Sequence, residues 1–160
     1  MEELLDLGAQ AGRLLVDRKQ TIAIAESSAA GLISAALLAV PGASAYFVGG
    51  AVVYTRTSRT ALLQIPEAAL EGIRASTQEY ALLLARSVRQ RLGTDWAIGE
   101  TGASGPTGNR YGDAAGHVCF GVSGPSEAAR TLETGHGNRL DNMYVFGAAA
   151  LRLFLELARA

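Results

Sequence analysis

Apolar positions along the chain recur with two different spacings, and this predicts helices that alternate with strands. Between residues 3 and 18, leucine and alanine side chains return every three or four positions, as on the buried face of an amphipathic helix. Short apolar or alternating runs typical of strands are expected at 21–25, 47–55, 96–99, 118–122 and 130–134. Further helices are expected at 29–39, 57–63, 78–92 and 140–158.

Local signals mark the ends of two of these helices. Pro41 and Gly42 follow the helix at 29–39 and are a strong stop signal. Ser76 and Glu79 stand three residues apart, the spacing of a capping box, so they are expected to open the helix that runs to Leu92. Gly93 is expected to end it.

The order of these elements predicts an α/β fold, a three-layer α/β/α sandwich with a mixed, mostly parallel sheet. The strands near residues 118 and 131 are separated by a short turn at 123–125, so they are expected to pair as an antiparallel hairpin. The chain has 160 residues, 49% of them hydrophobic, which is enough for one domain with a sizeable core. We therefore expect residues 1–160 to form a single domain.

Composition excludes several classes of protein. The net charge is −1 and the arginines are scattered, which argues against nucleic acid as a partner. No apolar run approaches the length of about 18 residues that crosses a membrane, and the N-terminus is acidic, unlike a signal peptide. A single cysteine, Cys119, rules out an internal disulfide and is expected to be a buried thiol. The sequence predicts a soluble cytoplasmic protein without a membrane partner.

The segment 21–32 is the most informative stretch, because an apolar run breaks into Glu26-Ser27-Ser28 and then into small helix-forming residues. It reads as a strand, a tight loop and a helix. The first amide groups of a helix are unpaired and favour negative charge. A serine placed there can cap the helix, bind an anion or act as a nucleophile, and capping is the commonest of the three roles.

Polar loops also follow two other predicted strands. The run from Tyr54 to Arg59 follows the second strand, and the loop 101–113, which holds four glycines, follows the third. Loops that follow parallel strands meet at one edge of an open sheet, where ligands bind. The glycine-rich loop matches neither the phosphate-loop nor the dinucleotide-binding pattern. Taken alone, it is equally compatible with a mobile surface loop.

The sequence predicts no metal site and no cofactor. Neither His117 nor His136 stands at a spacing typical of zinc ligands. Glu100 and Asp113 could bind a cation, but solvated loop carboxylates are commoner. Arg139, at the start of the last helix, is unfavourable for the helix dipole, so it indicates either a nearby anion or a plain surface arginine.

Four motifs follow one another in order along the chain, and the similarity that they indicate covers nearly its whole length. Residues 25–31 read A-E-S-S-A-A-G and resemble A-E-S-C-T-G-G, and residues 52–59 read V-V-Y-T-R-T-S-R and resemble V-x-Y-S-N-x-x-K. Residues 101–109, followed by 116–118, are similar to [ST]-G-x-A-G-P-x-G-G and G-x-V, and residues 137–139 are similar to G-D-R. These are motifs of the C-terminal domain of the CinA competence/damage-inducible proteins, and the chain therefore resembles that family.

Active members of that family are nicotinamide-nucleotide amidases, in which a serine attacks the carboxamide and a lysine takes its proton. Ser27 matches the serine, but Arg59 stands at the position of the lysine. A guanidinium has a pKa above about 12 and is a poor base. Lys19, the only lysine, precedes the first strand and lies some 25 Å from Ser27, at about 3.3 Å for each extended residue. It cannot replace the missing base.

The resemblance also implies the other site residues. Tyr54 is expected to contact the substrate or to orient Arg59, the alternative being a tyrosine half packed at the end of a strand. The residues that would contact substrate are Ser28, Ala30, Gly31, Thr101, Gly102, Ser104, Gly105, Pro106 and Arg139. Ala29 and Ala30 replace a threonine and a glycine of the family motif, which removes a hydroxyl group from this turn.

Three interpretations remain open at this point. Ser27 hydrolyses an amide such as that of nicotinamide mononucleotide, with Arg59 steering the phosphate or holding the oxyanion. Alternatively, the chain cleaves a different amide or an ester. In the third, it binds a nucleotide or phosphate without catalysis, using Arg59 and the amides that follow Ser27. In each case the partner is a small phosphate-bearing molecule, and a homo-oligomer is expected because the family commonly self-associates.

Overall fold

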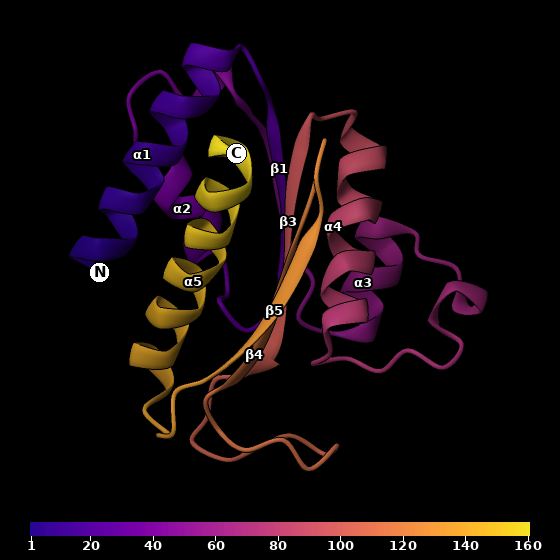
Figure 1. The fold of residues 1–160 in the computed structure, drawn as a ribbon. Helices are drawn as coiled ribbons and strands as arrows, with labels where there is room; N and C mark the ends of the chain where they lie inside the picture. The colour runs from indigo at the N-terminus through magenta and orange to yellow at the C-terminus, as the bar shows by residue number, and fades with distance from the viewer.

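Five strands form one sheet in the order β2-β1-β3-β4-β5 in this computed structural model, which describes residues 1–160. Helices cover both faces of the sheet (Figure 1). The elements are α1 (Glu2–Arg18), β1 (Ile22–Glu26), α2 (Leu32–Leu38), η1 (Ala43–Ala45), β2 (Phe47–Val52), α3 (Arg56–Leu63), η2 (Glu67–Leu70), α4 (Gln78–Leu92), β3 (Trp96–Ala103), β4 (His117–Ser123), β5 (Ala128–Glu133) and α5 (Arg139–Arg159).

The sheet is mixed, as the sequence predicts. Strand β1 lies between β2 and β3 and pairs in parallel with both. Strand β4 runs antiparallel to β3 and β5, so it alone opposes the direction of the other four strands. The predicted hairpin between β4 and β5 is confirmed. Because β1, β2 and β3 share one direction, the loops that follow them meet at one edge of the sheet.

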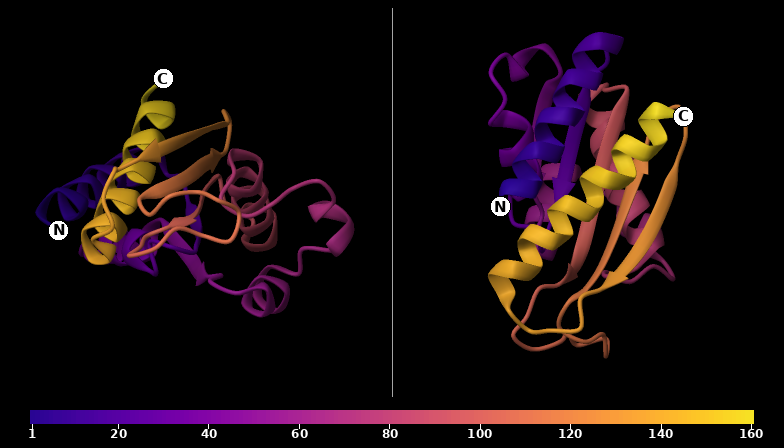
Figure 2. Two further views of the ribbon diagram at one scale, coloured as in Figure 1. Left: turned by 90° about the horizontal axis from the view of Figure 1, so that it is seen from below. Right: turned by 60° about the vertical axis from the view of Figure 1, so that its left-hand side comes forward.

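The two faces of the sheet are packed differently. Helices α1, α2 and α5 cover one face, while α4 and α3 lie on the other (Figures 1 and 2). Strand β1 is buried on both sides: Ile22 and Ile24 join the larger core under α5, whereas Ala23 and Ala25 face the smaller core under α4. Small residues bring α4 close to the sheet, since a Cβ at Gly99 would lie 2.0 Å from the Ala81 carbonyl oxygen.

Several predicted boundaries are shifted. Helix α2 begins at Leu32, three residues later than expected, and β3 extends to Ala103 instead of ending at residue 99. Strand β2 ends at Val52 because Thr55 serves as the N-cap of α3, where its side chain and that of Ser58 form a reciprocal capping box. No helix combines the length and the apolar character that a membrane crossing requires.

The capping box expected at Ser76 is wrong. The N-cap of α4 is Thr77, whose hydroxyl oxygen accepts from the Tyr80 amide. Ser76 lies one residue before the cap, with a positive φ of 60°, and its N–H donates to the hydroxyl oxygen of Thr101 at 3.1 Å. This bond joins the start of α4 to the end of β3.

Candidate functional site

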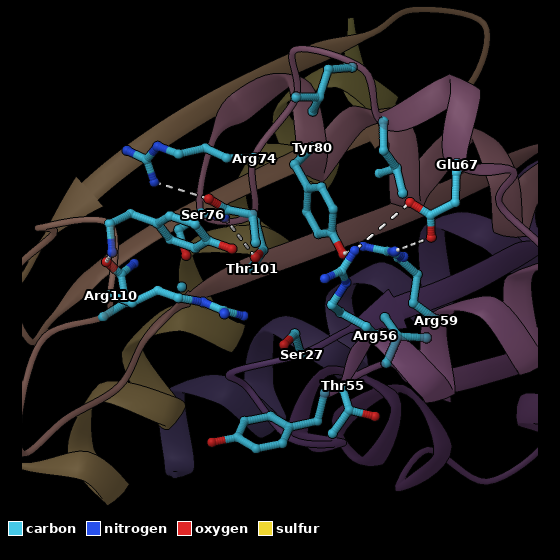
Figure 3. Close-up of a pocket in the computed structure, with 18 of the residues that line it drawn as sticks. Ser27, Thr55, Arg56, Arg59, Glu67, Arg74, Ser76, Tyr80, Thr101 and Arg110 are labelled. Carbon is cyan, nitrogen blue, oxygen red and sulfur yellow. Dashed lines mark hydrogen bonds and ion pairs between the residues drawn. The ribbon is translucent and has the colours of Figure 1, made fainter.

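A cavity of about 1060 Å³ opens at the edge of the sheet where β1, β2 and β3 end. Figure 3 shows its wall, which combines Ser27, the segment from the end of β2 to the start of α4, and parts of the loop after β3. Four arginines, two glutamates and two tyrosines besides Tyr54 take part: Arg56, Arg59, Arg74, Arg110, Glu67, Glu71, Tyr80 and Tyr111. The cavity is therefore polar and rich in guanidinium groups.

Five of the residues expected at the site line this cavity: Ser27, Tyr54, Arg59, Thr101 and Gly102. The others, which do not line it, are Ser28, Ala30, Gly31, Ser104, Gly105, Pro106 and Arg139. Residues from the ends of β1, β2 and β3 and from the loops that follow them thus meet at one pocket, as the sequence predicts. The role of the remaining residues as substrate contacts stays a prediction.

Ser27 does not cap α2. The N-cap of that helix is Gly31, and no side chain bonds to an amide from that position. The Ser27 hydroxyl makes no hydrogen bond within the chain, while its N–H donates to Glu100 at 2.9 Å. The N–H of Ser28 has no partner. A free hydroxyl followed by a free amide is the local arrangement of a nucleophile with an oxyanion donor.

Two buried glutamates hold the loop that carries Ser27. One oxygen of Glu100 accepts from the N–H groups of Ser27 and Ala29, both at 2.9 Å, and the other accepts from the Ser28 hydroxyl. Glu26 accepts from the amides of Ile33 and Ser34 at 3.1 and 3.0 Å. Most amides after Ser27 are therefore already bonded inside the protein. These bonded amides are not available to bind a ligand anion, contrary to the prediction from the sequence.

Burial changes the ionisation of both glutamates. Neither Glu26 nor Glu100 is exposed. Loss of hydration raises the pKa of Glu100 to about 7, against the opposing effect of its hydrogen bonds to Ser28, Ala29 and Ser27. It also raises the pKa of Glu26. Glu100, one of two candidate cation ligands, thus serves instead as an internal acceptor for the loop.

Ala30 occupies a backbone conformation that suits glycine. Its φ is 55°, in the left-handed region, where an L-residue other than glycine is strained by about 1 kcal/mol. We expect Ala30→Gly to stabilise the protein by about 0.5–1 kcal/mol, which raises Tm by about 2–3 °C. Thermal unfolding followed by circular dichroism measures this. The neighbouring Ala29, buried and without a positive φ, is the control, since Ala29→Gly should lower Tm.

Arg59 is buried but incompletely bonded. Only 6% of the residue is exposed. Its Nη1 donates to the Tyr80 hydroxyl at 3.3 Å, and its guanidinium lies 6.0 Å from the centre of that ring. Nε and Nη2 have no hydrogen-bond partner, although Nη2 lies 3.6 Å from a carboxylate oxygen of Glu67. The tyrosine in contact with Arg59 is thus Tyr80, not Tyr54.

The Tyr54 side chain contacts Arg139 and not Arg59. Its hydroxyl accepts from Arg139 Nη2 at 3.2 Å, and Nη1 of the same arginine donates to the Gly105 carbonyl oxygen at 2.6 Å. Tyr54 is 59% exposed, so it is not packed against the sheet. Arg139 links the loop after β2 to the loop after β3 at the rim of the cavity.

The loop after β3 is held by hydrogen bonds of Asp113, both within the loop and to the segment before α4. Asp113 accepts two hydrogen bonds from Arg74, at 2.7 and 3.0 Å, and one from the Asn109 side chain at 2.8 Å. The Arg74 guanidinium holds the pKa of Asp113 below its usual range. Asp113, the second candidate cation ligand, is thus committed to Arg74. No group of three His, Cys, Asp or Glu side chains is arranged to hold a metal ion.

A family model, the CinA C-terminal domain, matches residues 5–158. The chain belongs to this family. A CinA-like protein of Chlorobium limicola is 36% identical over 146 residues, which cover 88% of this chain and 34% of that protein. One from Parasynechococcus marenigrum is 41% identical over 120 residues, with coverage of 75% and 29%. The chain thus spans about a third of the length of these relatives.

Solved structures of the CinA superfamily share the fold. A protein of this superfamily from Escherichia coli matches with a TM-score of 0.88 at 23% identity, over 96% of this chain and 90% of that one. A competence or damage-inducible protein from Enterobacter asburiae matches with a TM-score of 0.88 at 25% identity, over 97% and 98%. The three-layer architecture with its mixed sheet is therefore that of the CinA superfamily.

Two departures from the CinA motif V-x-Y-S-N-x-x-K lie in the cavity wall. Arg56 stands at the asparagine position and Arg59 at the lysine position. The two arginines are three residues apart on α3, so they share one face of that helix. Both changes add guanidinium donors, and neither provides a group that can accept a proton near neutral pH.

Proposed function

We propose that the chain hydrolyses the carboxamide of a small phosphate-bearing molecule, with Ser27 as the nucleophile and nicotinamide mononucleotide as the first candidate substrate. The observation that carries this proposal is the free Ser27 hydroxyl at the wall of a guanidinium-lined cavity. The unpartnered Ser28 amide beside it is available to stabilise an oxyanion. Membership of the CinA family supports the choice of substrate through the resemblance described above.

The proposed reaction has two steps. Ser27 Oγ bonds to the carboxamide carbon, the C–N bond breaks, and the serine proton reaches the leaving nitrogen through a water molecule, so that ammonia departs. Water then attacks the resulting ester, which releases the carboxylic acid and restores the Ser27 hydroxyl. Arg59 takes no proton in this scheme, because its guanidinium stays charged. Its contribution is positive charge toward the anionic substrate.

We expect Arg59→Lys to keep or raise the rate of ammonia release, because lysine in a desolvated wall can accept the serine proton, whereas arginine cannot. Ammonia release from nicotinamide mononucleotide by both forms, in a coupled assay, measures this. Release by the wild type supports the amidase. Binding of the nucleotide without release by the wild type, with release gained in Arg59→Lys, contradicts it.

A second candidate function is recognition of a nucleotide without turnover. It is favoured by two observations: the Ser27 hydroxyl has no hydrogen bond to any acid or base, and the residue at the lysine position is an arginine. In this case calorimetry detects binding of nicotinamide mononucleotide, but no ammonia appears. The same pair of measurements therefore separates the two candidates.

A further inference from the structure

The corner of the cavity beside α3 offers hydrogen-bond donors and almost no acceptors. Arg59 Nε and Nη2 are buried without partners, and an unpaired buried donor costs free energy unless something binds to it. The Tyr80 oxygen accepts from Arg59, so its own hydrogen remains free to donate. Arg56, whose side chain is 74% exposed, adds a second guanidinium from the same helix. Figure 3 shows Arg56 and Arg59 beside Tyr80 in the wall.

The only anion near these donors in the structure is the side chain of Glu67. One of its oxygens lies 3.6 Å from Arg59 Nη2, and the other lies 3.9 Å from Arg56 Nη2. Both distances exceed hydrogen-bond length, so the carboxylate neutralises the corner in part without satisfying its donors. The Glu67 side chain is 72% exposed, and no residue of η2 is buried. This carboxylate can therefore be displaced without disturbing the core.

From these contacts we propose that Arg56, Arg59 and Tyr80 form the binding site for the phosphate group of the ligand, and that Glu67 occupies its approach until the ligand displaces it. A phosphate monoester presents three terminal oxygens, all acceptors, which complements a set of groups that only donate. The proposal deepens the function proposed above by placing the phosphate on α3. It also explains why two arginines replace asparagine and lysine of the CinA motif.

Exchange of one anion for another has a measurable consequence. Glu67→Gln removes the competing charge and keeps the shape of the side chain, so affinity for phosphate should rise about five- to tenfold. Glu2→Gln makes the same change of net charge in α1, on the other face of the sheet, and should leave affinity unchanged. Arg59→Met removes the buried donors and should weaken binding at least about tenfold.

The experiment is titration calorimetry at constant ionic strength with inorganic phosphate, nicotinamide mononucleotide and nicotinamide riboside. The proposal expects the mononucleotide to bind more tightly than the riboside, and this advantage to grow in Glu67→Gln. It is overturned if Glu67→Gln and Glu2→Gln bind phosphate equally, or if the riboside binds as tightly as the mononucleotide. Should Arg59→Met fail to fold, the comparison of Glu67→Gln with Glu2→Gln still decides.

Failure of this inference is distinguishable from failure of the amidase proposal. Ser27→Ala is expected to keep the phosphate affinity of the wild type, because Ser27 belongs to the loop after β1 and not to the α3 corner. A protein that binds phosphate through Arg59 yet releases no ammonia supports the phosphate site and contradicts the amidase. If the wild type releases ammonia but neither Glu67→Gln nor Arg59→Met changes the phosphate affinity, the amidase is supported and the phosphate site is contradicted.

Discussion

Replacing Ser27 with alanine is expected to reduce ammonia release at least about 1000-fold while changing ligand affinity by less than about threefold. The substitution removes the nucleophile but leaves the Ser27 amide bonded to Glu100, since that contact involves the backbone. The loop should therefore keep its shape. Single-turnover assays of ammonia and calorimetry with nicotinamide mononucleotide measure the two quantities.

Ser87→Ala is a matched control for this prediction. The Ser87 hydroxyl donates to the Leu83 carbonyl oxygen within α4, and the residue does not line the cavity. It should retain the activity of the wild type. If Ser27→Ala retains it as well, the nucleophile lies elsewhere and the proposed mechanism is wrong.

A second large effect is expected from Glu100→Gln on the pH dependence of stability. Burial raises the pKa of Glu100 from 4.5 to about 7 in the folded chain. Between these values the folded state holds a proton that the unfolded state has released, so stability is greatest at low pH and falls as pH rises through about 7. The loss for the wild type is about 2–3 kcal/mol between pH 5 and pH 8.

Glutamine should remove this dependence without dismantling the loop. Its amide oxygen can accept from the Ser27 and Ala29 amides, and its NH₂ group can donate to the Ser28 hydroxyl oxygen. Urea unfolding at pH 5, 6, 7 and 8 should show Glu100→Gln gaining about 2–3 kcal/mol on the wild type across this range. Glu2→Gln should follow the wild type. Parallel curves for the wild type and Glu100→Gln would show that the buried carboxyl does not change its charge here.

Most of the fold could be predicted from the sequence, because each strand is a short apolar or alternating run and apolar residues recur every three or four positions in each long helix. The start of α2 could not. Its position depends on the positive φ of Ala30 and Gly31 and on the Glu26 carboxylate, which bonds to the amides of Ile33 and Ser34. No sequence pattern indicates an alanine in the left-handed region, so the sequence predicts a helix that begins three residues before α2 does.

The site was predicted only in part, for a different reason. Ser27, Tyr54, Arg59, Thr101 and Gly102 stand in recognisable motifs, and all five line the cavity. The contact of Tyr80 with Arg59 and the approach of Glu67 depend on how α3, η2 and α4 pack together, and no local pattern records this.

The sequence does contain a signal for the role of the two buried glutamates. Glu26 and Glu100 each follow a run of apolar residues that forms a buried strand. A carboxylate in such a position needs internal donors, because its burial is otherwise costly. This argument would have indicated that the amides after Ser27 are taken by the protein itself.

The loop that presents Ser27 has a conformation that its own residues do little to specify. Glu100 within β3 bonds to the amides of Ser27 and Ala29 in this loop, and Glu26 at the end of β1 bonds to the amides of Ile33 and Ser34 in the helix that follows it. The residues that fix the shape of the loop therefore lie largely outside positions 27–31. This explains how the chain tolerates Ala29 and Ala30 in place of threonine and glycine. It also sets a rule for protein design: anyone grafting this serine loop onto another scaffold would have to transplant the glutamate of the neighbouring strand with it.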